Sequence, residues 1–170
     1  MEIVKEIQSK IDQDYFFIKG NIDIDSEYFI EKIKKGCLEQ GNMNFKTNII
    51  GNQTSWQYFN TDIEFNKILF KFLDYIDLNF SLPSYKLADA WGFECSLGSR
   101  TITHDHFPSL ISGVIYLNEN SQLLKFKDIN QIVKPEKGSF ALFSGFLKHG
   151  CSRQQDITKY GLSFNLNLVK

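Results

Sequence analysis

Few residues of this chain point to disulfides, nucleic acid or membranes. Among its 170 residues are three cysteines, Cys37, Cys95 and Cys151, which are far apart and form no Cys-x-x-Cys pair. An odd number of widely spaced cysteines argues against a disulfide framework and a zinc ribbon, and favours a reducing compartment. Arginine occurs only at Arg100 and Arg153, the formal net charge is -1, and the basic residues form no block. Long nucleic acids and anionic membrane surfaces are therefore not expected as partners.

Apolar stretches of membrane-spanning length are also missing. The first six residues contain no hydrophobic stretch of the kind that a signal peptide requires, and no apolar run elsewhere approaches the length of a membrane span. We therefore expect a cytoplasmic protein. A chain of 170 residues has the size of one domain with a substantial core, and no repeat or linker divides it. We expect residues 1–170 to form a single domain.

The helical patterns lie in the first part, residues 1–81, which we expect to provide helical support and the first strands. Asp25 or Ser26 can cap a helix through residues 28–35, and Gly36 is expected to weaken or end this helix near its last turn.

A second helix is predicted from Thr61, which forms a capping box with Glu64, and from apolar residues at helical spacing over 65–76. Between the two helices, a short strand is predicted near residues 45–50. This strand is followed by a polar and aromatic loop.

The remainder, residues 85–170, alternates short β-rich segments with turn signals. The predicted strands are Leu87–Glu94, Thr101–His106, Ile111–Leu117, Leu123–Phe126, Ser139–Phe143 and Tyr160–Val169. Short strands at even spacing after helices predict a mainly β (α+β) protein, a sandwich or small barrel with helices packed on one side. The last strand alternates large apolar residues (Leu162, Phe164, Leu166, Leu168) with small or polar ones (Gly161, Ser163, Asn165, Asn167). Its polar face is expected to line a cavity.

All three histidines fall in one pattern, His104-x-His106 followed at a distance by His149. Residues two apart in a strand point to the same face, so one strand can aim two imidazoles at one point, and His149 can complete the set. Three neutral nitrogen ligands suit Fe, Zn, Cu or Ni and leave coordination positions open. A His-x-His pair also occurs by chance among ordinary hydrogen-bonded polar residues, and the pattern alone leaves both interpretations open.

Three segments of the second half match the motifs of one known family in order. His104 to Leu117 reads approximately as His-x-His-Pro, a short gap and Ser-Gly-Val-x-Tyr, Pro135 to His149 is similar to the strand and loop before a distal metal ligand, and Leu162 to Leu166 contains Ser-Phe-Asn. The chain thus resembles a branch of the 2-oxoglutarate- and Fe(II)-dependent dioxygenases that is often found in phages and marine bacteria. Trp91 also lies where these proteins often have Trp.

This resemblance implies a double-stranded β-helix (a jelly-roll, cupin-like fold) with the N-terminal helices packed on one sheet. It implies Fe(II) as metal, 2-oxoglutarate as cosubstrate, O2, and hydroxylation of a small-molecule or peptide substrate, in a host cytoplasm if the gene is carried by a phage. The metal ligands would be His104, His106 and His149.

The ligand set departs from the family, which usually has a carboxylate at the position of His106. Asp105 is adjacent to His104 and would point to the opposite face of a regular strand, while Asp89 and Glu94 are more distant alternatives.

The cosubstrate anchor departs from the family as well. An Arg usually stands about ten residues after the distal His, where this chain has Lys159. Lys159 shares strand parity with Ser163 and is expected to face the cavity, although a solvated lysine is the alternative; Arg153 is the rival anchor. The pocket is further expected to contain Tyr116, Ser112 and Asn165.

Trp56, with Gln53 and Thr54, is a candidate for the lip on the substrate side or else part of the core.

Two other functions fit the same residues. A three-His, cupin-like oxygenase would not use 2-oxoglutarate, and Lys159 would then play no part in turnover. A non-catalytic β-sandwich, serving as a binding or virion module, would hold a structural metal or none.

Overall fold

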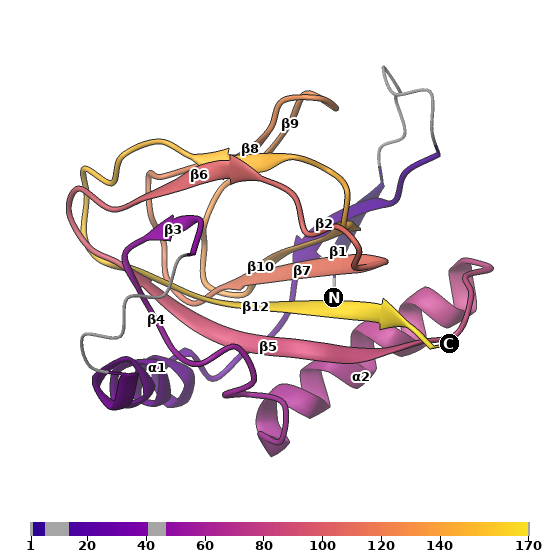
Figure 1. Ribbon diagram of the computed structural model, residues 1–170, viewed down its shortest axis with the longest axis horizontal. Helices are drawn as coiled ribbons and strands as arrows, with labels where there is room; N and C mark the ends of the chain where they lie inside the picture. Colours follow the sequence, from indigo (N-terminus) through magenta and orange to yellow (C-terminus); the bar gives the residue numbers. More distant parts are fainter. Residues whose placement is uncertain (1, 6–13, 41–46, 170) are drawn as a thin grey trace.

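A computed structural model describes residues 2–5, 14–40 and 47–169. Two antiparallel sheets face each other, and two helices cover the outer face of the larger sheet (Figure 1). Within the described residues, no helix is both long and apolar enough to cross a membrane.

The two sheets differ in size and strand length. The seven-stranded sheet has the order β1 (Glu2–Lys5), β2 (Phe17–Asn21), β10 (Ser139–Ser144), β7 (Ile111–Tyr116), β12 (Lys159–Leu168), β5 (Tyr85–Cys95) and β4 (Asn52–Gln53). The five-stranded sheet has the order β3 (Ile49–Ile50), β6 (Arg100–His104), β11 (His149–Cys151), β8 (Leu124–Phe126) and β9 (Gln131–Val133). The longest strands belong to the larger sheet, and the five-stranded sheet of shorter strands packs against it.

Each face of the larger sheet borders its own hydrophobic core. On the outer face, Phe72 of the second helix packs on Phe140 and Phe164, with ring centroids 4.7 and 6.1 Å apart. Between the sheets, Phe126 lies 4.8 Å from Phe143 and 5.0 Å from Phe17, measured between ring centroids. Because successive side chains of a strand point to opposite faces, strands such as β10 are apolar on both sides.

All six strands predicted between residues 85 and 170 are present, with shifted ends. The first predicted strand, over residues 45–50, is represented by β3, and residues 45 and 46 lie outside the described residues. The prediction that a strand runs to His106 is wrong, because β6 ends at His104. Leu168 was expected on the buried face but is 47% exposed. It lies past Leu166, where the pairing of β12 with β7 ends.

The first helix, α1 (Ser26–Gln40), is longer than predicted. The Asp25 carboxylate accepts a hydrogen bond from the Tyr28 N–H, so Asp25 supplies the cap. Of the two predicted effects of Gly36, weakening or ending the helix, the second is wrong, because α1 continues to Gln40. A Cβ at this position would lie 2.7 Å from Thr54 and 2.8 Å from Tyr58. Glycine therefore allows the helix to pass close to the loop that follows β4.

The second helix, α2 (Ile63–Asn79), begins one residue later than the predicted capping box requires. Asp62, not Thr61, is the N-cap, and its carboxylate accepts from the Phe65 N–H at 2.9 Å. The same carboxylate accepts from the Tyr28 hydroxyl at 2.9 Å and pairs with the Lys32 ammonium. Since Tyr28 and Lys32 belong to α1, one buried carboxylate joins the two helices.

Replacing Asp62 by Ala should lower the free energy of unfolding by about 2 kcal/mol, because a helix cap and a buried hydrogen bond are lost together. The Lys32 ammonium and the backbone and hydroxyl donors hold the pKa of Asp62 below its usual value despite burial. The contribution of its charge should be present above about pH 4 and be lost as the pH falls through the lowered pKa. Urea unfolding at pH 7 and pH 3 measures both effects.

Asp62→Asn is the matched control, because Asn caps helices as well as Asp but carries no charge. It should fall between wild type and the Ala variant at pH 7. An Ala variant as stable as wild type would contradict the role given to Asp62.

Candidate metal centre

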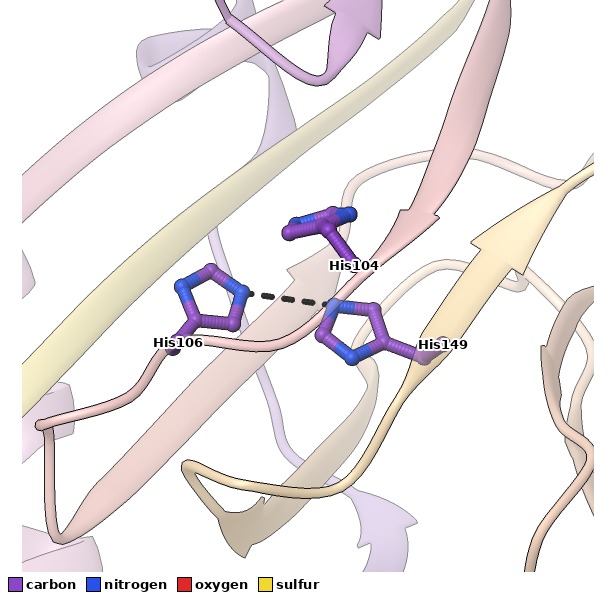
Figure 2. Close-up of side chains that lie close together, drawn as sticks. All are labelled: His104, His106 and His149. Carbon is purple, nitrogen blue, oxygen red and sulfur yellow. Dashed lines mark hydrogen bonds between the residues drawn. The ribbon is translucent and has the colours of Figure 1, made fainter.

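Two neighbouring strands and one turn bring the three histidines together (Figure 2). His104 is the last residue of β6 and His149 the first of β11, and the two are paired across these antiparallel strands. His106 lies two residues beyond the end of β6, where its backbone N–H donates to the Gly145 carbonyl at 2.6 Å. The sequence pattern thus correctly predicted that the three histidines lie close together, although His106 lies in a turn and not in the strand.

Backbone carbonyls fix the orientation of two of the rings. Nδ1 of His104 lies 2.7 Å from the Ile102 carbonyl oxygen, and Nδ1 of His149 lies 2.9 Å from that of Leu147. A carbonyl can only accept, so each Nδ1 carries the proton and each Nε2 keeps its lone pair. This leaves the tautomer that a metal-binding imidazole requires.

The spacing of two of the ring nitrogens, those of His106 and His149, fits a shared metal ion. Nε2 of His106 lies 3.3 Å from Nε2 of His149, and the donor atoms of all three histidines lie within 4.8 Å of one another. Two nitrogens bound at about 2.1 Å to one metal, with an angle of about 90–110°, would be about 3.0–3.4 Å apart. The observed separation falls in this range.

Burial keeps the three imidazoles neutral at physiological pH. Desolvation lowers the pKa of His106 to about 3, with the nearby His149 and His104 contributing. Burial likewise lowers the pKa of His149 to about 4 and places that of His104 below its usual value. Neutral rings need not lose a proton before they bind a cation.

Asp105 does not take part in this cluster. Its carboxylate accepts a hydrogen bond from the Phe107 N–H at 3.2 Å and so supports the turn that carries His106. The cluster of possible donors within the described residues consists of the three histidines alone.

Asp105→Asn should therefore leave the affinity for Fe(II) within about threefold of wild type, because the amide oxygen can still accept from Phe107. Anaerobic metal titration with a competing chelator measures this affinity. A loss of two orders of magnitude would place the carboxylate among the ligands.

An inner cavity opens between the sheets beside the histidines. Lys159, the first residue of β12, lines it and is 1% exposed. Its ammonium lies 3.7 Å from the Cys151 sulfur and 5.5 Å from the centroid of the Tyr116 ring. Within the described residues, the ammonium has no carboxylate partner and lies among soft or aromatic groups.

The other residues predicted for the cosubstrate are spread over several places. Tyr116 lines the inner cavity, and its hydroxyl has a pKa well above the usual value because the ring is buried. Ser112 is buried and donates to Asn165 at 2.7 Å, and Asn165 lines a different cleft. Arg153 is exposed and does not line the inner cavity.

Cys151 lines the inner cavity and was not predicted to do so. It is two residues after His149 on β11, so strand parity could have placed it on the same face. All three cysteines are free thiols, as predicted.

A second, outer cleft also adjoins the histidines. His104, His106, Ile49 and Trp91 border both spaces. Gln53 and Trp56 line the cleft as expected for a lip, whereas Thr54 is fully buried and accepts from the Gly92 N–H. The candidate metal centre therefore borders both the inner cavity and the outer cleft.

Comparison with solved structures identifies the fold. The viral collagen prolyl hydroxylase from Paramecium Bursaria Chlorella virus-1 has a TM-score of 0.69 and 17% identity, over 93% of this chain and 98% of that one. A prolyl-4-hydroxylase from Pseudomonas putida has a TM-score of 0.68 and 13% identity, over 91% and 93%. The fold is a double-stranded β-helix. The predicted fold class is thereby confirmed, including the helices packed on one sheet.

A third neighbour was solved with ligands. HygX from Streptomyces hygroscopicus, with nickel and 2-oxoglutarate bound, has a TM-score of 0.65 and 11% identity, over 90% of this chain and 83% of that one. No family model matches the sequence. No curated protein matches it either. At these identities the likeness is one of fold, and the function must be inferred from the site itself.

Proposed function

We propose that this chain is an Fe(II)- and 2-oxoglutarate-dependent oxygenase that hydroxylates its substrate. The overall reaction would convert R–H, O2 and 2-oxoglutarate into R–OH, succinate and CO2. When bound, the iron would supply the oxygen-activating chemistry that no side chain provides. The observation that carries the proposal is one cavity that holds three neutral imidazoles and a buried ammonium with no carboxylate partner among the described residues.

The three histidines would hold the metal through their Nε2 atoms. Backbone carbonyls already orient His104 and His149 for this, and orientation by a second hydrogen bond is usual for metal-binding histidines. A set of three neutral ligands leaves the full positive charge of the metal uncompensated by protein. An anionic chelate such as a 2-keto acid would be favoured in the open positions.

Lys159 would pair with the far carboxylate of 2-oxoglutarate. A buried ammonium is costly unless an anion compensates it, and the described residues supply none. Arg153 is exposed and does not line this cavity, which favours Lys159 as the anchor. The walls formed by Tyr116, Phe93 and Phe143 would exclude water around this ion pair. HygX, a neighbour of the same fold, was solved with 2-oxoglutarate bound.

A three-His oxygenase that does not use 2-oxoglutarate is the second candidate. It is favoured by one observation, the lack of a carboxylate in the histidine cluster. It gives no role to the buried ammonium of Lys159, and we therefore rank it second.

Anaerobic calorimetry on the Fe(II)-loaded protein tests the proposal, with 2-oxoglutarate as ligand and glutarate as control. Glutarate has both carboxylates but no keto group, so it can pair with Lys159 and cannot chelate. We expect much tighter binding of 2-oxoglutarate, and succinate formation when O2 is admitted. Oxygen consumption without binding of 2-oxoglutarate would favour the second candidate. If the protein binds no metal, the remaining interpretation would be a non-catalytic binding or virion module.

A further inference from the structure

The outer cleft carries a charge opposite to that of the inner cavity. Two acidic residues line it, Asp89 of β5 and Asp105 of the turn after β6, and both are half-buried. No Lys or Arg occurs among its described lining residues. In the inner cavity, by contrast, Lys159 is the one charged side chain of the described lining. The two spaces therefore favour ligands of opposite charge.

Several buried polar atoms of the cleft have no hydrogen-bond partner among the described residues. Gln53 is 7% exposed, and within this part of the chain neither its amide nitrogen nor its amide oxygen is hydrogen-bonded. The indole N–H of Trp91, which is 3% exposed, and the side-chain oxygen of Asn167 likewise have no partner there. All three residues line the cleft. A buried polar group without a partner costs free energy, so these atoms indicate a ligand that would satisfy them.

Acceptors outnumber donors in this set. The carboxylates of Asp89 and Asp105, the Gln53 oxygen and the Asn167 oxygen accept, whereas the Gln53 nitrogen and the Trp91 indole donate. A protonated amine offers three donors and no acceptor and carries a positive charge. It can pair with the acceptors of this set, as a carboxylate or a phosphate cannot, while the Gln53 nitrogen and the Trp91 indole require an acceptor atom elsewhere on the ligand.

Aromatic faces add a further preference for a cation. Trp56 is 39% exposed at the cleft and packs edge to face against Trp91, with ring centroids 4.7 Å apart. The face of a tryptophan ring attracts an ammonium group. Tryptophan and carboxylate together form a usual environment for an alkylammonium ion.

We propose that the outer cleft binds the substrate through a protonated amine. The ammonium would lie between the carboxylates of Asp89 and Asp105 and beside Trp56, next to the histidines. This inference rests on the proposed function for the reaction that follows binding, but the binding itself requires neither metal nor turnover. The amine could belong to a lysine side chain of a polypeptide or to a small amine such as an amino sugar.

Tryptophan fluorescence can test this directly, because Trp56 and Trp91 are the two tryptophans of the chain and both line the cleft. The protein is titrated metal-free, and again with Zn²⁺ and 2-oxoglutarate, with two pairs of probes. One pair is a blocked Gly-Lys-Gly peptide and its acetyl-lysine form. The other pair is glucosamine and N-acetylglucosamine. In at least one pair, the charged member should bind at least about tenfold more tightly, since a hydrogen bond to a charged group is worth about 1.5–3 kcal/mol.

Asp89→Asn and Asp105→Asn should each weaken binding of the charged probe about tenfold and leave the neutral probe unaffected. Asp128→Asn is the matched control, because it removes the same charge from an exposed position that does not line the cleft. It should have no effect.

Equal affinity for the two members of both pairs, no response to any probe, or an equal loss in the Asp128 variant would overturn the inference. A response in only one pair would identify the source of the amine. Amine binding without metal or 2-oxoglutarate binding would support the inference while the proposed function failed. Tight 2-oxoglutarate binding without a preference for amines would leave the proposed function and remove only this inference.

Discussion

His106→Ala should remove most of the iron from the purified protein and weaken Fe(II) binding by at least about a hundredfold. Loss of a group that merely orients a metal ligand already costs about 10–100-fold, and His106 would be a ligand itself. Its Nε2 lies 3.3 Å from that of His149, so one ring cannot replace the other without moving its strand or turn. Elemental analysis and an anaerobic chelator competition measure the loss.

Two comparisons separate this effect from misfolding. The fold should persist, because His106 lies in a turn and is half-buried, outside both hydrophobic cores. Asp105→Asn, one residue earlier in the same turn, should keep its iron. Wild-type metal content in the His106 variant would show that the three imidazoles do not form the site.

Lys159→Ala should weaken 2-oxoglutarate binding by roughly one to two orders of magnitude. A hydrogen bond to a charged group is worth about 1.5–3 kcal/mol, and about 1.4 kcal/mol corresponds to a factor of ten. Iron binding should hardly change, because the ammonium is not a donor to the metal. Anaerobic calorimetry measures both affinities on one sample.

Lys159→Met separates the charge from the volume of the side chain. Met fills a similar space without a buried charge, so it should lose 2-oxoglutarate affinity as Ala does and be at least as stable as wild type. Lys148→Ala removes a charge from an exposed position nearby in sequence and should bind normally. Unchanged affinity in both Lys159 variants, with a loss in Arg153→Ala, would move the anchor to Arg153.

Sequence patterns predicted the direction of side chains correctly where that direction depends on a single strand or short segment. The alternation in β12 correctly placed Leu162 and Phe164 against the helices, and Ser163 and Lys159 on the cavity side. The His-x-His spacing brought both rings to one point even though β6 ends at His104. In both cases, the direction of a side chain follows from its position along a short segment.

Features that depend on a partner distant in sequence were not predictable. Asp62 caps α2 in place of Thr61, and its carboxylate is also held by Tyr28 and Lys32 of another helix. Gly36 remains inside α1 because a neighbouring loop requires the space that a side chain would fill.

The outer cleft could not be predicted from the sequence for the same reason, because its residues come from segments that are distant in sequence. It is assembled from β3 and β4, the loop after β4, β5, β12, the end of β6 and the turn that follows it. The charge of the cleft emerges only when these segments meet.

The pairing of His104 with His149 also links metal binding to the rigidity of the five-stranded sheet. Both residues belong to the small sheet, in which β8, β9 and β11 have three residues each and β3 has two. A bound ion would act as a clamp across β6 and β11, whereas the larger sheet is already backed by two helices. Amide hydrogen exchange in the small sheet should therefore be faster after chelation, while exchange in β7 and β12 changes little. The availability of metal would then determine how often the small sheet opens locally.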